Sequence, residues 1–225
     1  MPITPTPAPL EVAARLYDEL PRFLSGPDYG SAGNIVSQAS AGPPQMIPSA
    51  GDLNFPVGGN PPNPIPDFNP VQVFALGIGA VLQGLGISAG AVPIGWRLFI
   101  TNAATNSYVM AWISQLPTGV WKMAAAYYGA AVANLLDASQ GLAPLLPGNA
   151  PYELRMLTLP WINLQAFWLK SQVSGVSDVL VPFPALTAQL IASFYNQPSY
   201  TEAQFLAAIK ADISTWGSTM ANSGG

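Results

Sequence analysis

The amino-acid sequence predicts an all-α protein: a helical bundle of about five to seven helices with a long Pro/Gly-rich irregular segment near its N-terminus. Apolar residues recur at helical spacing in several stretches, and half of the chain is hydrophobic. The 24 prolines and 21 glycines fall largely between those stretches. We therefore expect an N-terminal amphipathic helix at 1–23, a Pro/Gly-rich arm at 24–70 and a helical core domain at 71–225.

The first predicted helix covers residues 9–23. Charged residues surround an apolar face there, which is typical of a surface helix. That face would hold Leu10, Ala13, Tyr17 and Leu20. In the arm that follows, pairs such as Pro43-Pro44 and Pro61-Pro62 exclude a regular helix. Its scattered apolar residues favour an arm packed on this chain or on a partner.

Residues 71–92 carry no charged side chain. Plotted as a helix, they place glycine and glutamine along one narrow stripe. Five glycines would cost this helix about 1 kcal/mol each relative to alanine, so close packing would have to offset them. A strand followed by a turn is the competing interpretation, and we favour the helix. The stripe gives the candidate interaction residues Gln72, Gly79, Gln83, Gly86 and Gly90.

A further helix is predicted at 119–138, because apolar side chains follow the 4-3-4-3 spacing of a packing seam. Residues 98–116, which precede it, are uncharged but too polar to face lipid. Residues 152–171 read as two helical segments around Pro160. The last two helices are predicted at 184–196 and 201–215, the second capped by Thr201. The seam residues at 119–138 are Trp121, Ala125, Tyr128, Val132 and Leu135.

The composition excludes several classes of function. The chain has no cysteine and no histidine, which removes thiolate and imidazole catalysis and the usual zinc and haem ligands. Seven Lys and Arg residues against eleven acids give a net charge of −4, so we expect no nucleic-acid partner. We expect no cofactor, metal site or catalytic residue. The N-terminus has no recognisable Sec signal peptide, and no compartment is indicated.

Aromatic and acidic side chains give weaker candidates. Trp161 and Trp168 lie on one predicted helix face, and Trp121 and Tyr128 on another, so aromatic residues could line a ligand pocket or simply fill the core. Glu153 with Arg155, and Asp18 with Glu19, could supply acid chemistry. We interpret the acids and bases between 137 and 178 as structural ion pairs or caps: Asp137, Glu153, Arg155, Lys170 and Asp178.

Only 8% of the residues are charged, against about 25% in a typical soluble domain. A surface so poor in charge favours association. The first hypothesis is therefore a non-enzymatic structural or interaction protein in a homo-oligomer or with other subunits. The alternatives are a membrane-active or lipid-associated protein that inserts residues 71–92, and a small-ligand binder or carboxylate-dependent enzyme with an aromatic pocket.

Overall fold

The computed structural model describes residues 3–25, 68–102, 107–183 and 197–222, and within them it contradicts the all-α prediction. Strand residues outnumber helical residues, and the strands belong to a nine-stranded mixed sheet. The described chain divides into two compact units. Unit 1 contains 1–4, 74–93 and 145–225, and unit 2 contains 5–73 and 94–144. The predicted arm at 24–70 and the predicted helix at 184–196 fall largely or wholly outside the described residues.

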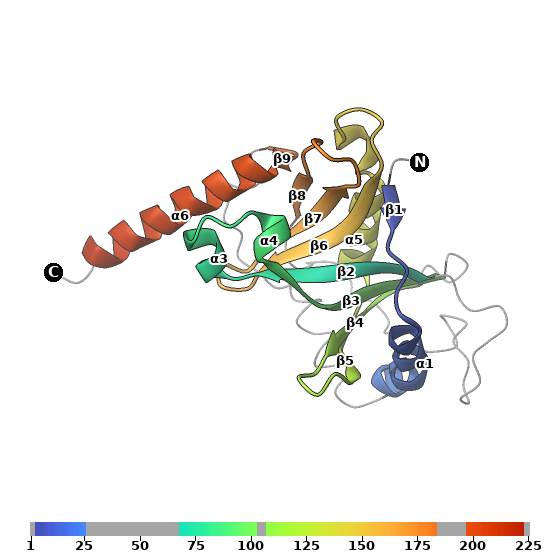
Figure 1. Cartoon of the computed structure of the whole chain (residues 1–225). Coiled ribbons are helices and arrows are strands. Elements are labelled where there is room, and N and C mark those ends of the chain that lie inside the picture. Colours follow the sequence, from blue (N-terminus) through green and yellow to red (C-terminus); the bar gives the residue numbers. More distant parts are fainter. Residues whose placement is uncertain (1–2, 26–67, 103–106, 184–196, 223–225) are drawn as a thin grey trace. The chain divides into compact units, whose positions relative to one another are not determined.

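Unit 2 is built from helix α1 (Leu10–Ser25), strands β3 (Ala91–Asn102), β4 (Ser107–Gln115) and β5 (Trp121–Tyr128), and helix α5 (Ala130–Gln140). Its strand order is β5-β4-β3-β2, where β2 (Phe68–Leu76) has its first residues in this unit. Helix α1 contacts β4 and β5 (Figure 1). The core lies between them.

The helix predicted at 9–23 is present as α1, but its buried face agrees with the predicted one only in part, at Leu20 and the half-buried Tyr17. Val12, Leu16 and Leu20 are fully buried, one per turn, against β3, β4 and β5. Leu10, which the sequence placed on the apolar face, is 87% exposed. The buried stripe at i, i+4 and i+8 is the ordinary pattern of a helix that covers a sheet.

The helix predicted at 119–138 is wrong in its first half, where the chain forms β5. A bulge explains the misleading spacing: Trp112 pairs with Ala125 and Ile113 with Met123, so Ala124 is an extra residue in β5. An odd separation such as that of Trp121 and Tyr128 would place two strand residues on opposite faces. The extra residue returns both to the face that packs on the core of unit 2.

Unit 1 contains strands β6 (Tyr152–Leu159), β7 (Leu164–Ser171), β8 (Val179–Phe183) and β9 (Tyr200–Thr201), with β1 (Ile3–Pro5) paired to β6. The order is β2-β6-β7-β8-β9, in which β2 contributes its last residues. The short helices α3 (Ile78–Leu82) and α4 (Ile87–Gly90) and the long α6 (Glu202–Asn222) complete the unit, and a 3₁₀ turn (Ala143–Leu145) leads into it.

The two helical segments predicted at 152–171 are wrong, because residues 152–171 form the β6–β7 hairpin. Tyr152, Leu154 and Met156 are buried, whereas Glu153 and Arg155 between them are only partly covered. That alternation is the signature of a strand. Asn163, with φ of 51°, makes the turn between the two strands.

The single helix predicted at 71–92 is also wrong. The segment ends β2, forms α3 and α4, and enters β3 at Ala91. Gly77 and Gly86 precede the two short helices in extended conformation, and Gly84 has a φ of 75°, in the left-handed region that breaks a helix. The glycines therefore interrupt the helix that they were expected to pack, and the stripe does not exist as one face.

Candidate functional site

A cleft of about 480 Å³ in unit 1 is the strongest candidate for a functional site. It lies among α4, the turn that precedes β8, and the start of α6. Two acids, two serines and a threonine contribute to its wall, and none of its lining residues is aromatic. The lining consists of Ser88, Val176, Ser177, Asp178, Thr201, Glu202, Ala203 and Leu206.

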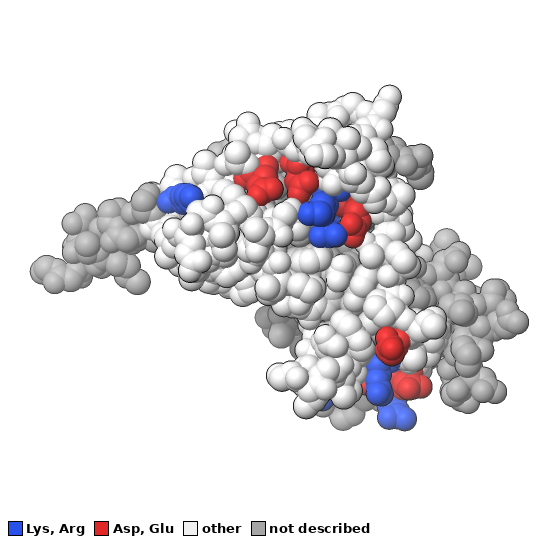
Figure 2. All heavy atoms as spheres, viewed as in Figure 1, with Lys and Arg blue, Asp and Glu red and all other residues white. Residues whose placement is uncertain are grey.

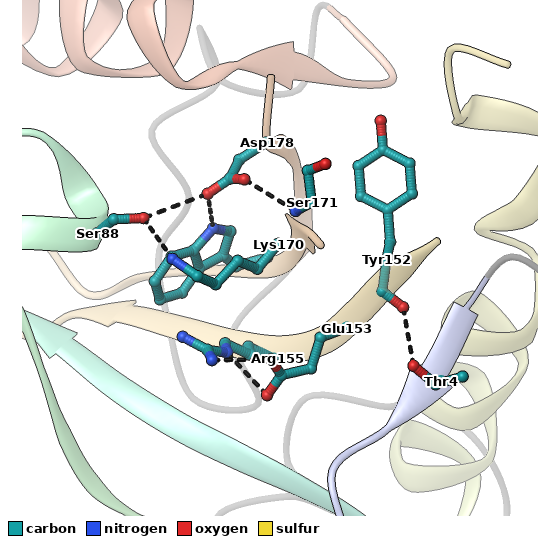
Figure 3. Close-up of polar contacts among 9 residues, drawn as sticks. Thr4, Ser88, Tyr152, Glu153, Arg155, Lys170, Ser171 and Asp178 are labelled. Atoms are coloured by element: carbon teal, nitrogen blue, oxygen red, sulfur yellow. Dashed lines mark hydrogen bonds and ion pairs between the residues drawn. The ribbon is translucent and has the colours of Figure 1, made fainter. Parts of the chain in front are cut away.

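Asp178 is the centre of a hydrogen-bond network at this cleft (Figure 3). Its Oδ1 accepts the backbone N–H of Ser171 at 2.9 Å, and its Oδ2 accepts the indole N–H of Trp168 at 2.8 Å. The hydroxyl of Ser88 lies 3.5 Å from the same Oδ2. Trp168 is only 1% exposed. Asp178 therefore provides the hydrogen-bond acceptor for the indole N–H of Trp168, a buried ring to which water has little access.

Lys170 extends this network to α4. Its Nζ donates to the Ser88 hydroxyl at 2.7 Å and lies 5.2 Å from the centre of the Trp168 ring. Serine, lysine and aspartate are residue types of nucleophilic sites. In this contact Lys170 donates and the Ser88 hydroxyl accepts, so the contact joins α4 to β7.

Glu202, the second acid of the cleft, also accepts a hydrogen bond from another part of the chain. Its Oε1 accepts the backbone N–H of Ile87 at 2.6 Å, at the start of α4. A side chain at Gly86 would bring a Cβ within 2.6 Å of that oxygen, so the glycine makes room for the bond. Thr201 caps α6 as predicted, with its hydroxyl 3.3 Å from the backbone nitrogen of Gln204.

A second charged pair lies on the β6–β7 hairpin. Arg155 binds Glu153 through two nitrogens, at 3.0 and 2.8 Å, which confirms the ion pair predicted for these residues. The guanidinium carbon also lies 4.8 Å from the ring centre of Phe74 and 5.0 Å from that of Trp168. Figure 3 shows this pair and the Asp178 network on the same part of unit 1. Glu153 and Asp178 are thus both bonded to other groups of the chain.

Among the groups whose pKa is shifted by burial are Tyr152 in unit 1 and Arg97 in unit 2. Burial, with a smaller contribution from the charge of Asp178, raises the pKa of Tyr152, whose hydroxyl lies 3.5 Å from the carbonyl oxygen of Ser177. In unit 2, burial lowers the pKa of Arg97 to about 10, although the charge of Tyr127 opposes the shift. Arg97 packs 5.8 Å from the Trp112 ring. Both remain in their usual protonation state at neutral pH, so neither acts as a general base there.

The predicted interaction residues are divided between the two units. Gln72, Trp121 and Tyr128 belong to unit 2, where Tyr128 is buried and Trp121 packs on the core. In unit 1, Trp161 donates its indole N–H to the carbonyl of Leu76 at 3.2 Å, and Trp168 is the buried partner of Asp178. The glycine and glutamine candidates of unit 1 differ from one another in their surroundings.

Gly79 and Gln83 are exposed on α3 and at its end, and a Cβ at Gly79 would meet nothing within 4 Å. Gly90 is instead enclosed, since its Cβ would lie 2.8 Å from that of Ala80. Gly86 lies against Glu202. Sequence reasoning named Asp178 as a structural residue but missed Ser88 and Glu202, because only the fold brings α4 and α6 together.

The described part of the chain has neither a cluster of potential metal-ligating side chains nor a helix suited to span a membrane. Among those residues no group of three or more acids is placed to hold a metal ion. No helix within the same ranges has both the length and the apolar character needed to cross a bilayer. Comparison of the chain with known protein families, curated proteins and solved structures finds no match.

Proposed function

We propose that this chain is a non-enzymatic structural protein that assembles with further copies of itself through an apolar surface on α3 and the turn that follows it. We call this the α3 surface and define it by Ile78, Leu82 and Leu85. The observation that carries the proposal is that these three aliphatic side chains are 42%, 65% and 39% exposed within a segment that has no charge.

The local geometry supports a rigid contact surface. Ile78 and Leu82 are one turn apart on α3, so they share a face. In the same segment, Val81 and Ile87 are fully buried in the core of unit 1, and Glu202 holds the start of α4. The backbone that carries the exposed side chains is therefore anchored, which lowers the entropic cost of association.

The distribution of charge favours a second copy as the partner. Each copy carries a net charge of −4, so two copies repel wherever their acids approach. Figure 2 shows charged side chains over α1, over α6 and over the α4–β8 region, while the surface over α3 is white. Contact through the α3 surface removes apolar area from water. Each Å² of apolar area removed is worth roughly 25 cal/mol, and the three side chains that define the surface carry no charge.

The cleft supports an enzymatic function less well. Both of its acids accept hydrogen bonds from the chain itself, and Lys170 is a donor to Ser88. Catalysis by a pair of carboxylates needs one acid free to hold a proton and the other free to meet substrate or water. The aromatic pocket that the sequence suggested is absent from this cleft, whose lining has no ring.

We expect the double substitution Ile78→Gln and Leu82→Gln to dissociate the assembly, because two exposed aliphatic side chains are replaced by polar ones. Light scattering during size-exclusion chromatography should give more than the 23.5 kDa of one chain for the wild type at high concentration and one chain's mass for the variant. Leu116→Gln with Val173→Gln is the matched control, since these side chains are 41% and 43% exposed elsewhere. The control should assemble like the wild type.

Two outcomes would contradict the proposal. One is a wild type with the mass of a single chain at every concentration. The other is a wild type that floats with phosphatidylcholine vesicles while the Ile78/Leu82 variant does not, because lipid would then be the partner of the α3 surface.

A further inference from the structure

Strand β5 is the edge strand of unit 2. It pairs with β4 along one side, and no strand of the described residues pairs with its other side. An edge strand presents backbone N–H and C=O groups that can pair with a strand of another chain. β5 has eight residues, long enough for a stable ladder, and Lys122 is its only charged residue.

The direction of the backbone groups follows from the hairpin that joins β4 to β5. Leu116 donates its N–H to the carbonyl of Val120 at 2.9 Å, and the pairing continues through Ser114 with Lys122. Alternate residues of an antiparallel strand direct their N–H and C=O groups toward and away from the partner. The backbone groups of Trp121 and Met123 therefore point away from β4, toward the open edge.

Glu19 of α1 occupies one of these outward groups. Its Oε2 accepts the backbone N–H of Met123 at 2.9 Å. The Glu19 side chain is only 20% exposed, and Arg15, one turn earlier, lies 3.9 Å from its other oxygen. Since Leu16 and Leu20 on either side of it are buried against the sheet, α1 holds the carboxylate in this position.

We propose that Glu19 closes the open edge of β5 against pairing with β5 of a second copy of this chain. A pairing strand needs the Met123 N–H as a donor, and its own carbonyl oxygen would have to occupy the place of the Glu19 carboxylate. The carboxylate thus satisfies the donor and blocks the incoming strand by its volume and charge. The proposal is independent of the α3 surface, which belongs to unit 1.

A second copy of β5 is the occupant that fits this edge. Two β5 strands related by a twofold axis run antiparallel, and each contributes the same outward groups, so one contact closes both edges. In wild-type pairs the two Glu19 carboxylates would be carried into the contact with the strands. Removing the carboxylate therefore both frees the donor and removes a like-charge repulsion.

The test compares Glu19→Ala with Glu19→Gln, in the background of Ile78→Gln and Leu82→Gln so that the α3 surface does not contribute. The glutamine keeps an oxygen that accepts the Met123 N–H, whereas alanine has none. We expect Glu19→Ala to show about twice the mass of Glu19→Gln in light scattering at high concentration.

Hydrogen exchange is the second measurement, and the associated form should exchange more slowly in the 121–128 segment. Asp18→Ala, an exposed neighbour on the same helix, is the charge-matched control and should keep the mass of the Gln variant.

The proposal is overturned if folded Glu19→Ala keeps the mass of Glu19→Gln, or if it associates while exchange in the 121–128 segment is unchanged. Circular dichroism shows whether the alanine variant folds. If it does not, Glu19→Asn carries the same test, because asparagine is neutral like glutamine but one methylene shorter, so that its oxygen falls short of the Met123 N–H. An asparagine variant with the mass of the Gln variant would then refute the proposal.

Discussion

Replacing Gly95 with alanine is expected to destabilise the protein by about 3 kcal/mol, at the upper end of the usual cost of forcing extra atoms into a packed site. Gly95 pairs with Ser114 across β3 and β4. An alanine Cβ would collide with the backbone carbonyl oxygen of Ile113 and lie 3.1 Å from the Cα of Ser114. Backbone atoms in a paired strand cannot move aside without breaking the ladder. The midpoint of urea unfolding measures the loss, provided that its slope is unchanged.

Two other glycines make this prediction specific. A Cβ at Gly86 would meet the Glu202 carboxylate, which is the movable end of a side chain, so Gly86→Ala should cost less than Gly95→Ala. A Cβ at Gly79 would meet nothing, and within α3 alanine is favoured over glycine by about 1 kcal/mol. Gly79→Ala should therefore be neutral or stabilising. Equal effects at the three positions would contradict the packing described for β3 and β4.

Asp178→Ala is expected to cost about 2–4 kcal/mol of folding free energy. The substitution leaves the indole N–H of Trp168 and the backbone N–H of Ser171 without their acceptor, and an unsatisfied buried donor costs about 1–3 kcal/mol. Because Trp168 is almost fully buried, water cannot replace the carboxylate at no cost. Urea unfolding followed by tryptophan fluorescence measures the change.

Asp178→Asn is the graded companion, because its remaining side-chain oxygen can serve one of the two donors. It should fall between the wild type and Asp178→Ala. Asp137→Ala is the control, since Asp137 is exposed on α5, and it should change stability by less than about 0.5 kcal/mol. If Asp178→Ala is as stable as Asp137→Ala, the Asp178 network contributes nothing to the fold.

The spacing of apolar residues did not predict the fold class, because two local features hide the strands. One produces a helix-like spacing in a strand, and the other removes the alternation that marks a strand. In β5, the extra residue Ala124 places Trp121 and Tyr128 on one face at a separation that otherwise indicates a helix. In β7, Phe167, Trp168 and Leu169 are all buried, so both faces of the strand are covered and the alternation of apolar and polar residues disappears. A continuous apolar run of this kind cannot be assigned by periodicity alone.

Other features were visible in the sequence. The charged helix α1, the Thr201 cap of α6 and the Glu153–Arg155 pair depend on residues within a few positions of one another, and all three are present. The alternation of Tyr152, Leu154 and Met156 with charged residues was also a readable strand signal. The contacts of Glu202 with Ile87 and of Glu19 with Met123 join residues 115 and 104 positions apart, and only the tertiary fold produces them.

Hydrogen–deuterium exchange on the assembled protein tests the central claim most directly, because it locates the contact as well as detecting it. The measurement compares the wild type at high concentration with the Ile78→Gln and Leu82→Gln variant at the same concentration. We expect the wild type to exchange more slowly in residues 77–86, around α3, and at equal rates in α5 and the β6–β7 hairpin. Equal exchange across residues 77–86, or slowing confined to another segment, would contradict assembly through the α3 surface.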